Sequence, residues 1–567
     1  MTEEKINYLL TLDPPAPGRL RLVPLGGLGE IGMNMMVYEY GEDIIILDCG
    51  VMFPGEETPG VDLIIPDTTY LDDRKDRIRG IFLTHCHEDH IGALPYFLRE
   101  LDVPVYGTCL TLGLIQPKLK EHKMTGSVEL IEVKPRDVVE AGAFMVEFVR
   151  MTHSTVDCVG MAVHSPVGTV FHTGDFKIDP TPVDGKGMDF YTLSRLGDEG
   201  VLLLLSDSTN SEREGFTLSE KEVGDTFDQI FRDAAGRIIA TTFASNIHRI
   251  QQLIDMAVKY KRRVVFAGRS MVNNTRIAGD LGYLSIPSGL QATFGDLTHL
   301  DDDEVLVITT GSQGEAMSAL ARMSFDEHKQ VEIDKGDTVI ISARVIPGNE
   351  RSIARIINNL YRLGAKVYYE KVSEIHVSGH ASQEEQKLMI NIIKPKFFMP
   401  IHGEYRHLVT HAGLAERTGI LRKNILVSEN GDVIEVTRDG LEKVGHAPNG
   451  RVFVDGKGVG DVEDAVLRDR KHLAADGFCI VTVGIDRHTG EIIRDPDVTS
   501  RGFIFEEEAE DLLVQAEQSV KSSLEAMPAN LRTDQQEVQE VVMTALKRYL
   551  YKQTSRRPMI LPVIIEL

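Results

Sequence analysis

The stretch HCHEDH, residues 85–90, directly follows an apolar, strand-like segment. Alternate residues of an extended chain point the same way, so His85 and His87 can face one metal ion together. A turn after His87 can bring Asp89 and His90 to a second ion. Imidazole and carboxylate ligands suit zinc or manganese. The stretch therefore predicts the start of a site for two divalent metal ions, which together can activate water and hold a phosphate.

The remaining ligands of such a site must come from elsewhere in the chain. His153, Asp175 and His402 each follow an apolar, strand-like segment. Loops at strand ends cluster around shared sites, so we expect these side chains to join the residues of the HCHEDH stretch. Asp175 is the candidate for a carboxylate that bridges the two ions, and His402 could complete the second. The alternative for any single one of them is an ordinary polar loop residue.

Length and composition indicate a multidomain protein. A chain of 567 residues is too long for one ordinary core, so two to four domains are expected. Its apolar runs are strand-sized and fall short of the ~20 residues that span a bilayer, so no membrane partner is expected. The polar N-terminus has no secretory apolar region. Five cysteines form no CxxC pair, which favours a reducing cytoplasm.

The formal net charge of −25 bears on the substrate. Taken alone it argues against a nucleic-acid ligand, because neutralising phosphates favours basic surfaces. A groove can nevertheless be positive while the outer surface is acidic, and bound divalent ions add positive charge. The charge is an objection to a nucleic-acid substrate and does not exclude one.

The pattern of apolar residues divides the chain into segments with different predicted secondary structure. From about residue 209 to 364 it repeats strand–loop–helix units, which are typical of a parallel α/β sheet. The C-terminal part reads as a separate α+β unit behind a glycine-rich linker. The predicted bounds are an N-terminal arm at 1–18, a first segment at 19–208, an α/β domain at 209–364, a further segment at 365–447, a linker at 448–463 and a C-terminal domain at 464–567.

Residues 27–32 match the G-x-G-x-x-G pattern of dinucleotide-binding proteins. That use of the pattern needs a helix next, whose N-terminus holds the pyrophosphate. Residues 33–40 read as a strand instead. The pattern therefore indicates a tight glycine-rich turn close to the metal site, and we do not expect a nucleotide cofactor.

At this point the residues resemble a known superfamily. H-x-H-x-D-H with a later histidine and aspartate resembles the metallo-β-lactamases. Three further segments resemble the beta-CASP nucleases, its nucleic-acid-cutting branch. They are SDST at 206–209, which places Asp207, HVSGHAS at 376–382, which places His380, and HGE at 402–404, which places His402.

Longer stretches are similar to the ribonuclease J family. They lie at residues 24–32, 48–50, 53–55, 243–246, 309–315 and 346–349. The resemblance implies an αββα metallo-β-lactamase sandwich, interrupted by an inserted α/β beta-CASP domain and followed by a C-terminal α+β domain that helps dimerise. It also implies RNA cleavage, both internally and 5′ to 3′ from the end, with a preference for a 5′-monophosphate.

The same resemblance implies cofactors and partners. The cofactors are two divalent metal ions, zinc or manganese, and a structural calcium for which Asp48 is a candidate ligand. The partners are RNA, a second copy of the chain or a higher oligomer, and other RNA-decay or ribosome-associated proteins. The implied setting is rRNA processing and mRNA decay in the cytoplasm.

Three residues are predicted to take part in catalysis. Asp89, beside the metals, is placed to orient or deprotonate water. His380 is expected to contact the scissile phosphate and protonate the leaving oxygen. Asp207 is expected to hold a histidine in the required tautomer.

A reader of 5′ ends also needs a phosphate pocket, which backbone N–H groups at helix starts can form. The alternative for each such segment is a simple helix cap. The candidates are Ser245, Asn246, Ile247, His376, Val377, Ser378, Gly379, His380, Ala381 and Ser382.

Three other functions compete with a ribonuclease. A small-molecule metallo-hydrolase would not need the α/β insertion or a counterpart of His380. A DNA nuclease of the same branch is hard to separate from a ribonuclease by sequence. A non-catalytic RNA-binding scaffold would usually have lost metal ligands, whereas here every ligand position is filled.

Overall fold

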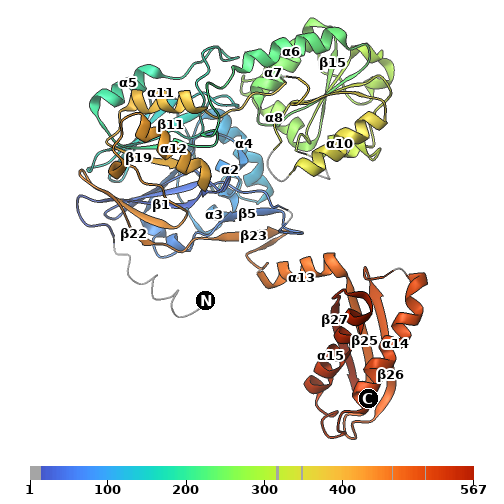
Figure 1. Ribbon diagram of the computed structural model, residues 1–567. Coiled ribbons are helices and arrows are strands. Elements are labelled where there is room, and N and C mark those ends of the chain that lie inside the picture. The colour runs from blue at the N-terminus through green and yellow to red at the C-terminus, as the bar shows by residue number, and fades with distance from the viewer. Residues whose placement is uncertain are drawn as a thin grey trace. The chain divides into compact units, whose positions relative to one another are not determined.

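The computed structural model describes residues 14–55, 57–313, 318–345, 349–373, 375–462, 464–504 and 506–566 (Figure 1). Most of the predicted N-terminal arm, at 1–18, lies outside these residues. The chain forms two compact units. The first comprises the chain up to Phe53 together with Leu63–Val452, and the second comprises Pro54–Asp62 and Phe453–Leu567.

The first unit contains two mixed sheets. The eight-stranded sheet has the order β22-β21-β1-β3-β4-β6-β7-β8, and the six-stranded sheet has the order β19-β13-β12-β11-β10-β9. The strands of the larger sheet are β1 (Leu20–Gly26), β3 (Met35–Tyr40), β4 (Asp43–Leu47), β6 (Ile78–Phe82), β7 (Val105–Gly107), β8 (Leu130–Glu132), β21 (Asp432–Val436) and β22 (Leu441–His446). Those of the smaller sheet are β9 (Val138–Ala141), β10 (Phe144–Arg150), β11 (Val159–His164), β12 (Thr169–His172), β13 (Val201–Asp207) and β19 (Phe397–Ile401).

The core lies between these two sheets. Alternate residues of β1, β3 and β4, such as Leu22, Tyr38 and Ile45, pack in one apolar cluster with Phe148 and Met161 of the opposite sheet. The residues between them are buried as well, so these strands are buried on both faces. β4 accordingly is a continuous apolar run from Ile44 to Leu47 and not an alternation.

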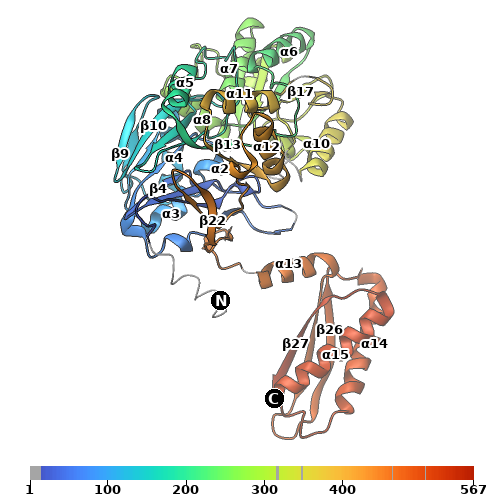
Figure 2. The ribbon, with the colours of Figure 1, turned by 60° about the vertical axis from the view of Figure 1, so that its left-hand side comes forward.

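Helices cover the outer faces of the sandwich (Figure 2). A second apolar cluster joins the six-stranded sheet to α5 (Phe190–Glu199), α11 (Gln383–Ile393) and α12 (Tyr405–Arg417). The helix α4 (Cys109–Glu121) packs on β7 and β8, and two short helices precede it, α2 (Glu88–Ile91) and α3 (Leu94–Phe97). The order of layers is α, β, β, α, which confirms the predicted sandwich.

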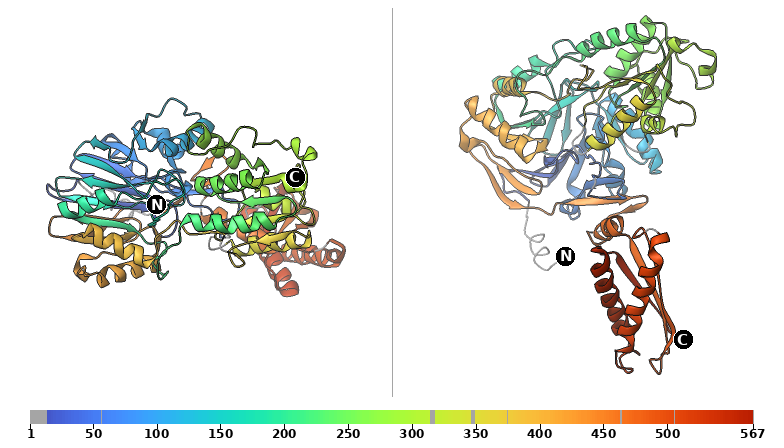
Figure 3. Two further views of the ribbon diagram at one scale, coloured as in Figure 1. Left: turned by 90° about the horizontal axis from the view of Figure 1, so that it is seen from above. Right: turned by 45° about the vertical axis from the view of Figure 1, so that its right-hand side comes forward.

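An α/β domain with a parallel sheet is inserted between β13 and α11 (Figures 1 and 3). Its five-stranded sheet has the order β15-β16-β14-β17-β18, and every pairing is parallel. The strands are β14 (Ile238–Thr241), β15 (Arg263–Ala267), β16 (Val305–Thr309), β17 (Thr338–Ile341) and β18 (Lys366–Tyr368). The helices are α6 (Glu220–Asp233), α7 (Ile247–Lys259), α8 (Arg269–Asp280), α9 (Ala319–Ser324) and α10 (Glu350–Arg362).

The second unit has its own core. In its three-stranded sheet, β25 (Phe478–Ile485) pairs antiparallel with β26 (Ile492–Arg501) and parallel with β27 (Met559–Glu566). Two long helices, α14 (Glu506–Glu525) and α15 (Gln535–Thr554), bury one face of this sheet. The helix α13 (Asp464–Asp476) precedes the sheet. This is the predicted α+β domain.

The glycine-rich stretch at 448–463 is not a bare linker, so that prediction is corrected. It contains β23 (Arg451–Asp455) and β24 (Gly458–Val459), which pair antiparallel. The Asp62 N–H donates to the Val454 carbonyl at 2.8 Å. The glycine at 456, with φ of 58°, serves the tight turn between the two strands, because this conformation costs glycine little. Glycine in this stretch therefore marks a hairpin.

The glycine-rich turn at 27–32 lies where it was predicted. The strand β3 follows it instead of a helix, which removes the dinucleotide interpretation. Within the turn, β2 (Leu28–Gly29) pairs in parallel with β20 (Gly403–Glu404). Gly26 has no room for a side chain, since a Cβ there would lie 1.9 Å from the Met33 carbonyl oxygen. Because β2 pairs with β20, the turn lies directly beside the segment that carries His402.

Four buried charged side chains join the inserted domain to the first. Arg249 donates to Glu220 Oε2 at 2.6 Å and to the Ile375 carbonyl at 3.1 Å. Lys177 Nζ lies 3.6 Å from both Glu220 Oε1 and Asp179 Oδ2. The pKa of Glu220 is lowered to about 2, because Arg249 and Lys177 outweigh the burial that would raise it.

This low pKa predicts how the stability depends on acid. A carboxyl with a folded-state pKa near 2 and an ordinary value of 4.5 stabilises the fold fully above pH 4.5. That contribution, about 3 kcal/mol, is lost as the pH falls from 4.5 towards 2. In denaturant titrations, Glu220→Gln should be less stable at pH 7 and should lose less stability than wild type across that pH range. Glu222→Gln, at an exposed position on the same helix, is the matched control; equal pH slopes for wild type and Glu220→Gln would contradict the prediction.

In the part of the chain that the structure describes, every helix is too short or too polar to cross a bilayer.

Candidate metal centre

The predicted ligands meet at one edge of the six-stranded sheet. β12, β13 and β19 are parallel neighbours, so the loops after them share this edge. Asp175 follows β12 and His402 follows β19. The HCHEDH stretch runs from the loop after β6, in the other sheet, into α2, which carries Asp89 and His90. His153 follows β10. The structure thus brings together all of the predicted metal ligands.

The predicted ligand atoms form two groups that share one carboxylate, and a third group, Asp207, His380 and His402, shares His402 with the second. Within each group all ligand atoms lie within 4.8 Å of one another, and Asp175 belongs to the first two. The first group is His85, His87, His153 and Asp175, and the second is Asp89, His90, Asp175 and His402. This is the arrangement expected for two cations bridged by an aspartate.

Asp175 is the centre of the cluster. Its Oδ2 lies 3.3 Å from His90 Nε2 and 3.7 Å from both His85 Nε2 and His153 Nε2. Its Oδ1 lies 3.4 Å from His402 Nε2, but no hydrogen bond of the described residues reaches this buried oxygen. An unpaired carboxylate oxygen is costly to bury, so a cation is the natural partner. The donor set therefore fits the predicted divalent ions.

Hydrogen bonds behind the cluster set the histidine tautomers. The Thr84 hydroxyl donates to Asp48 Oδ2 at 2.9 Å, so Thr84 accepts from His85 Nδ1 at 3.0 Å. His90 Nδ1 donates to the same Asp48 oxygen at 2.7 Å. In both rings a proton therefore sits on Nδ1, and Nε2 faces Asp175. Partners of this kind orient metal-binding histidines and raise their basicity.

The same arrangement holds for the other two ligands from later strands. His153 Nδ1 donates to the Gly379 carbonyl at 2.6 Å. His402 Nδ1 donates to Thr209 Oγ1 at 2.7 Å, and the Thr209 hydroxyl donates to Asp207 Oδ1 at 2.8 Å. His153 and His402 also present Nε2 to the centre. His87 differs: its Nδ1 faces the cluster, 2.9 Å from His85 Nε2.

The pKa shifts agree with a cation site. Burial lowers the pKa of His85 and His153 well below the ordinary value, and burial lowers that of His87 to about 4. Burial also acts on His90 and His402, but nearby carboxylates, Asp175 foremost, outweigh it and raise both pKa values. Since a metal ligand must be unprotonated, binding of ions here releases protons and weakens at low pH.

Asp48 is a partner of the metal ligands, and the calcium prediction for it is corrected. Its Oδ1 accepts from the Thr84 N–H at 2.8 Å. Its Oδ2 accepts from the Thr84 hydroxyl and from His90, as described above. The carboxylate is buried, with its backbone in the left-handed region at φ of 62°. Both oxygens are therefore occupied by neighbours of the metal centre.

Asn34 is a residue of this site that the sequence interpretation missed. Its backbone N–H and its Nδ2 both donate to the Asp89 carbonyl at 3.0 Å. Its Nδ2 also lies 3.4 Å from Asp89 Oδ2. Asn34 follows the glycine-rich turn, so the turn positions the residue that holds Asp89 in place. A polar residue between that turn and an apolar strand was the available signal.

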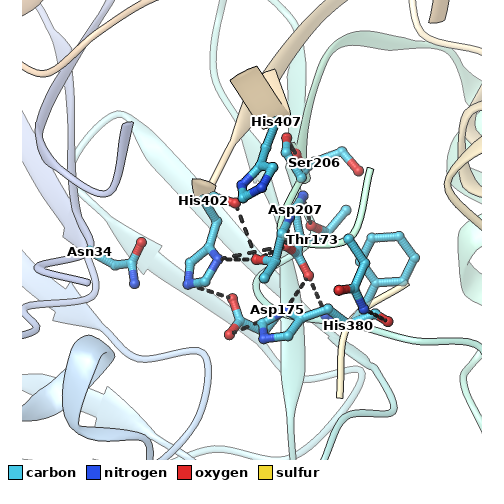
Figure 4. A network of polar contacts seen from close by, with 12 residues as sticks. Asn34, Thr173, Asp175, Ser206, Asp207, His380, His402 and His407 are labelled. Carbon is cyan, nitrogen blue, oxygen red and sulfur yellow. Dashed lines mark hydrogen bonds and ion pairs between the residues drawn. The ribbon is translucent and has the colours of Figure 1, made fainter. Parts of the chain in front are cut away.

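Asp207 links His380 to the metal centre (Figure 4). His380 Nδ1 donates to Asp207 Oδ2 at 2.8 Å and lies 3.9 Å from Asp175 Oδ2. Burial lowers the pKa of His380, but the Asp207 carboxylate outweighs it and the net pKa is raised. Through Thr209, the same carboxylate also orients His402. Asp207 therefore has the position predicted for it, behind both histidines.

Part of the predicted phosphate pocket is occupied by the chain itself. The N–H of His380 donates to Ser378 Oγ, that of Ala381 to the Phe176 carbonyl and that of Ser382 to Glu385. These three amides are therefore not available to a phosphate. In this segment, the residues still predicted to bind a phosphate are His376, Val377, Ser378 and Gly379. Gly379 packs against His153, where a Cβ would lie 2.6 Å from the ring.

The other predicted phosphate segment is also corrected. Asn246 accepts from the Arg249 N–H at 3.0 Å and is the N-cap of α7. The Asn246 and Ile247 N–H groups donate to the carbonyls of Phe243 and Ser245, and Ile247 is buried. Asn246 and Ile247 therefore form a helix cap, which was the alternative considered for them, while Ser245 stays a prediction.

Comparison with known families agrees with this geometry. The fold and the site define a member of the metallo-β-lactamase superfamily, whose model matches residues 28–213. Three further models match: "Ribonuclease J, beta-CASP domain" at 235–360, "Zn-dependent metallo-hydrolase RNA specificity domain" at 364–427 and "Ribonuclease J C-terminal domain" at 465–567. The chain belongs to the ribonuclease J family.

Similar proteins include three from distant bacteria. Ribonuclease J of Thermus thermophilus is 45% identical over 96% of this chain and 95% of its own length. Ribonuclease J of Helicobacter pylori strain 26695 is 41% identical over 98% of this chain and 80% of its own. Ribonuclease J2 of Bacillus subtilis is 40% identical over 96% of this chain and 98% of its own length. A solved structure of a protein of unknown function from Enterococcus faecalis V583 aligns with a TM-score of 0.52 and 17% identity over 74% of this chain and 100% of that one, which shows a shared fold.

Proposed function

We propose that this chain is a metal-dependent ribonuclease that degrades RNA 5′ to 3′, favours a 5′-monophosphate end and also cuts internally. The observation that carries the proposal is the pair of ligand groups sharing Asp175, with the Asp207–His380 pair directly beside them. Membership of the ribonuclease J family and the match to an RNA specificity domain support RNA as the substrate.

The residues that would hold the ions are the seven of the two ligand groups. When bound, two divalent ions supply positive charge to the scissile phosphate and lower the pKa of a water molecule. Asp89 is placed to orient that water, since Asn34 holds its backbone. His380 donates its Nδ1 proton to Asp207, and this carboxylate favours the doubly protonated ring. The second proton, on Nε2, can then pass to the leaving 3′-oxygen.

A local concentration of positive charge supports a phosphate site near residues 376–379. Burial lowers the pKa of Arg213, and the positive charge of Arg344 lowers it further, while Glu370 opposes both. Burial lowers the pKa of His376 to about 3, and the positive charges of Arg249, Lys177 and Arg344 add to this effect against the opposing Glu220. This charge offsets the formal −25 at the place where RNA would bind.

The assembly and setting are part of the proposal. We infer a homodimer formed through the C-terminal unit, whose sheet exposes Ile493, Leu561 and Val563. A monomer in sedimentation of the full chain would contradict it. The five cysteines are free, which agrees with a reducing cytoplasm. Contacts with other RNA-decay or ribosome-associated proteins remain an expectation from the family.

End-labelled RNA tests the proposal. Purified chain with Mn²⁺, Mg²⁺ or Zn²⁺ is given RNA that carries a 5′-monophosphate, a 5′-triphosphate or a 5′-hydroxyl, and DNA of the same sequence. We expect mononucleotide release fastest from the monophosphate RNA. His87→Ala should lose this activity, because it removes a ligand of the first group. His488→Ala, at an exposed histidine of the second unit, is the matched control. Equal cleavage of DNA, or no RNA cleavage with any metal, would overturn the proposal.

A further inference from the structure

We propose that Glu385 is a positioning residue for the catalytic centre, through backbone amides that it holds from three separate segments. Its Oε1 accepts from the Ile178 N–H at 2.7 Å. Its Oε2 accepts from the Thr217 N–H at 2.6 Å and from the Ser382 N–H at 2.8 Å. The side chain is fully buried. One carboxylate thus joins three loops that are far apart in the sequence.

Each of these loops carries or contacts a residue of the centre. Ile178 lies three residues after Asp175, on the loop that follows β12. Ser382 lies two residues after His380. The Thr217 hydroxyl donates to the His380 carbonyl at 2.8 Å. The carboxylate of Glu385 therefore ties the bridging aspartate to the histidine that faces it.

Further hydrogen bonds between the same loops hold them in fixed positions relative to one another. The Ala381 N–H donates to the Phe176 carbonyl at 2.7 Å. Asn210, from the loop that carries Asp207, donates to the His380 carbonyl at 2.9 Å. With Thr217, this carbonyl has two donors, and neither is a metal ligand. Loss of Glu385 removes the acceptor around which the three loops are arranged.

A capping role alone does not account for this carboxylate. Ser382 and Glu385 do form the capping box of α11, and that motif needs only the bond to the Ser382 N–H. The bonds to Ile178 and Thr217 lie outside the helix. All three donors require an acceptor, which an ionised carboxylate supplies on both oxygens. A glutamine amide would place its NH₂ group against at least one of these N–H groups.

The proposal rests on the proposed nuclease activity, and its test separates the two. We compare wild type, Glu385→Gln and Glu385→Asp for kcat and KM on 5′-monophosphate RNA, for bound metal by elemental analysis, and for thermal unfolding. Misplacing a catalytic group by about 1 Å costs on the order of 10²-fold in rate. We expect Glu385→Gln to lower kcat by about that factor, with KM and metal content near wild type. Glu385→Asp, which keeps two acceptor oxygens, should recover part of the loss.

Glu384→Gln is the matched control. Glu384 is the neighbouring residue on α11, and its side chain is half-exposed and pairs with Lys387 at 2.6 Å. This variant should keep the wild-type kcat. A second measurement is amide hydrogen exchange, which needs no activity. Glu385→Gln should speed exchange in the peptides containing Ile178 and Thr217, while the core strands stay protected.

The outcomes are distinct. A wild-type kcat in Glu385→Gln, or a loss of bound metal equal to the loss of rate, overturns the positioning role. If wild-type protein cuts no RNA, the proposed function fails, and unchanged exchange at Ile178 and Thr217 would then overturn the positioning role separately. If Glu385→Gln does not fold, Thr217→Val removes the hydroxyl that contacts the His380 carbonyl and Ser382 Oγ and keeps the N–H that Glu385 accepts. A wild-type kcat in that variant also counts against the proposal.

Discussion

Asp175→Ala is expected to abolish RNA cleavage and to release bound metal from both sites at once. Asp175 belongs to both ligand groups, and its Oδ1 is buried without a hydrogen bond from the described residues. Removing it leaves two sets of histidines without the carboxylate that joins them. We expect kcat/KM to fall by at least about 10⁴-fold, which corresponds to about 5 kcal/mol of transition-state stabilisation.

The measurement combines elemental analysis with cleavage of end-labelled RNA. His153→Ala belongs to the first group only and should spare part of the metal content. Asp198→Ala, at an exposed position of α5, is the control for losing a carboxylate elsewhere. Full metal occupancy in Asp175→Ala would show that Asp175 does not bridge the ions.

The second large effect is expected at His380. His380→Ala should keep both metal ions, because His380 belongs to neither of the groups that share Asp175. Its turnover should fall by about 10²- to 10⁴-fold, the usual contribution of general acid catalysis. KM should change less than kcat, since the proton reaches the leaving oxygen only in the transition state. Single-turnover cleavage and elemental analysis measure both quantities.

Asp207→Asn and His446→Ala complete this experiment. Asparagine at 207 keeps the shape but weakens the ion pair with His380, so its loss of rate should approach that of His380→Ala. His446 is an exposed histidine that also pairs with an aspartate, Asp432, at 3.3 Å, and its loss should leave turnover unchanged. Loss of both metals in His380→Ala would show that His380 is a ligand.

The metal ligands could be predicted from the sequence because each has a local signal. The residues of the HCHEDH stretch stand together, and His153, Asp175 and His402 each follow an apolar strand. In a sandwich of this kind, strand ends meet at one edge, so a polar residue at each end is enough to place it. The α/β pattern of residues 209–364 could be predicted too, because its strand–loop–helix repeats differ from the pattern of the flanking segments.

The residues behind the ligands carried weaker signals. Asn34, Thr84 and Thr209 are ordinary polar residues next to strands. Their roles depend on which loop lies opposite each of them in the folded chain. The spacing of residues in the sequence does not predict this. The predicted phosphate pocket was too wide for a related reason. A capped helix start offers free N–H groups only if no other loop covers them, and here Phe176 and Glu385 do.

The sequence by itself predicted the parallel α/β segment and the candidate metal ligands, because local periodicity and residue chemistry at strand ends are contained in contiguous sequence. The αββα sandwich and its interruption by that segment were predicted from the resemblance to metallo-β-lactamases and beta-CASP nucleases. The tertiary structure alone decided that Asp48 serves His90, that Asp207 serves both His380 and His402, and that Glu385 joins three loops. Those are contacts between segments separated by tens to hundreds of residues, and only the packing of the two sheets and the insertion brings them within hydrogen-bonding distance.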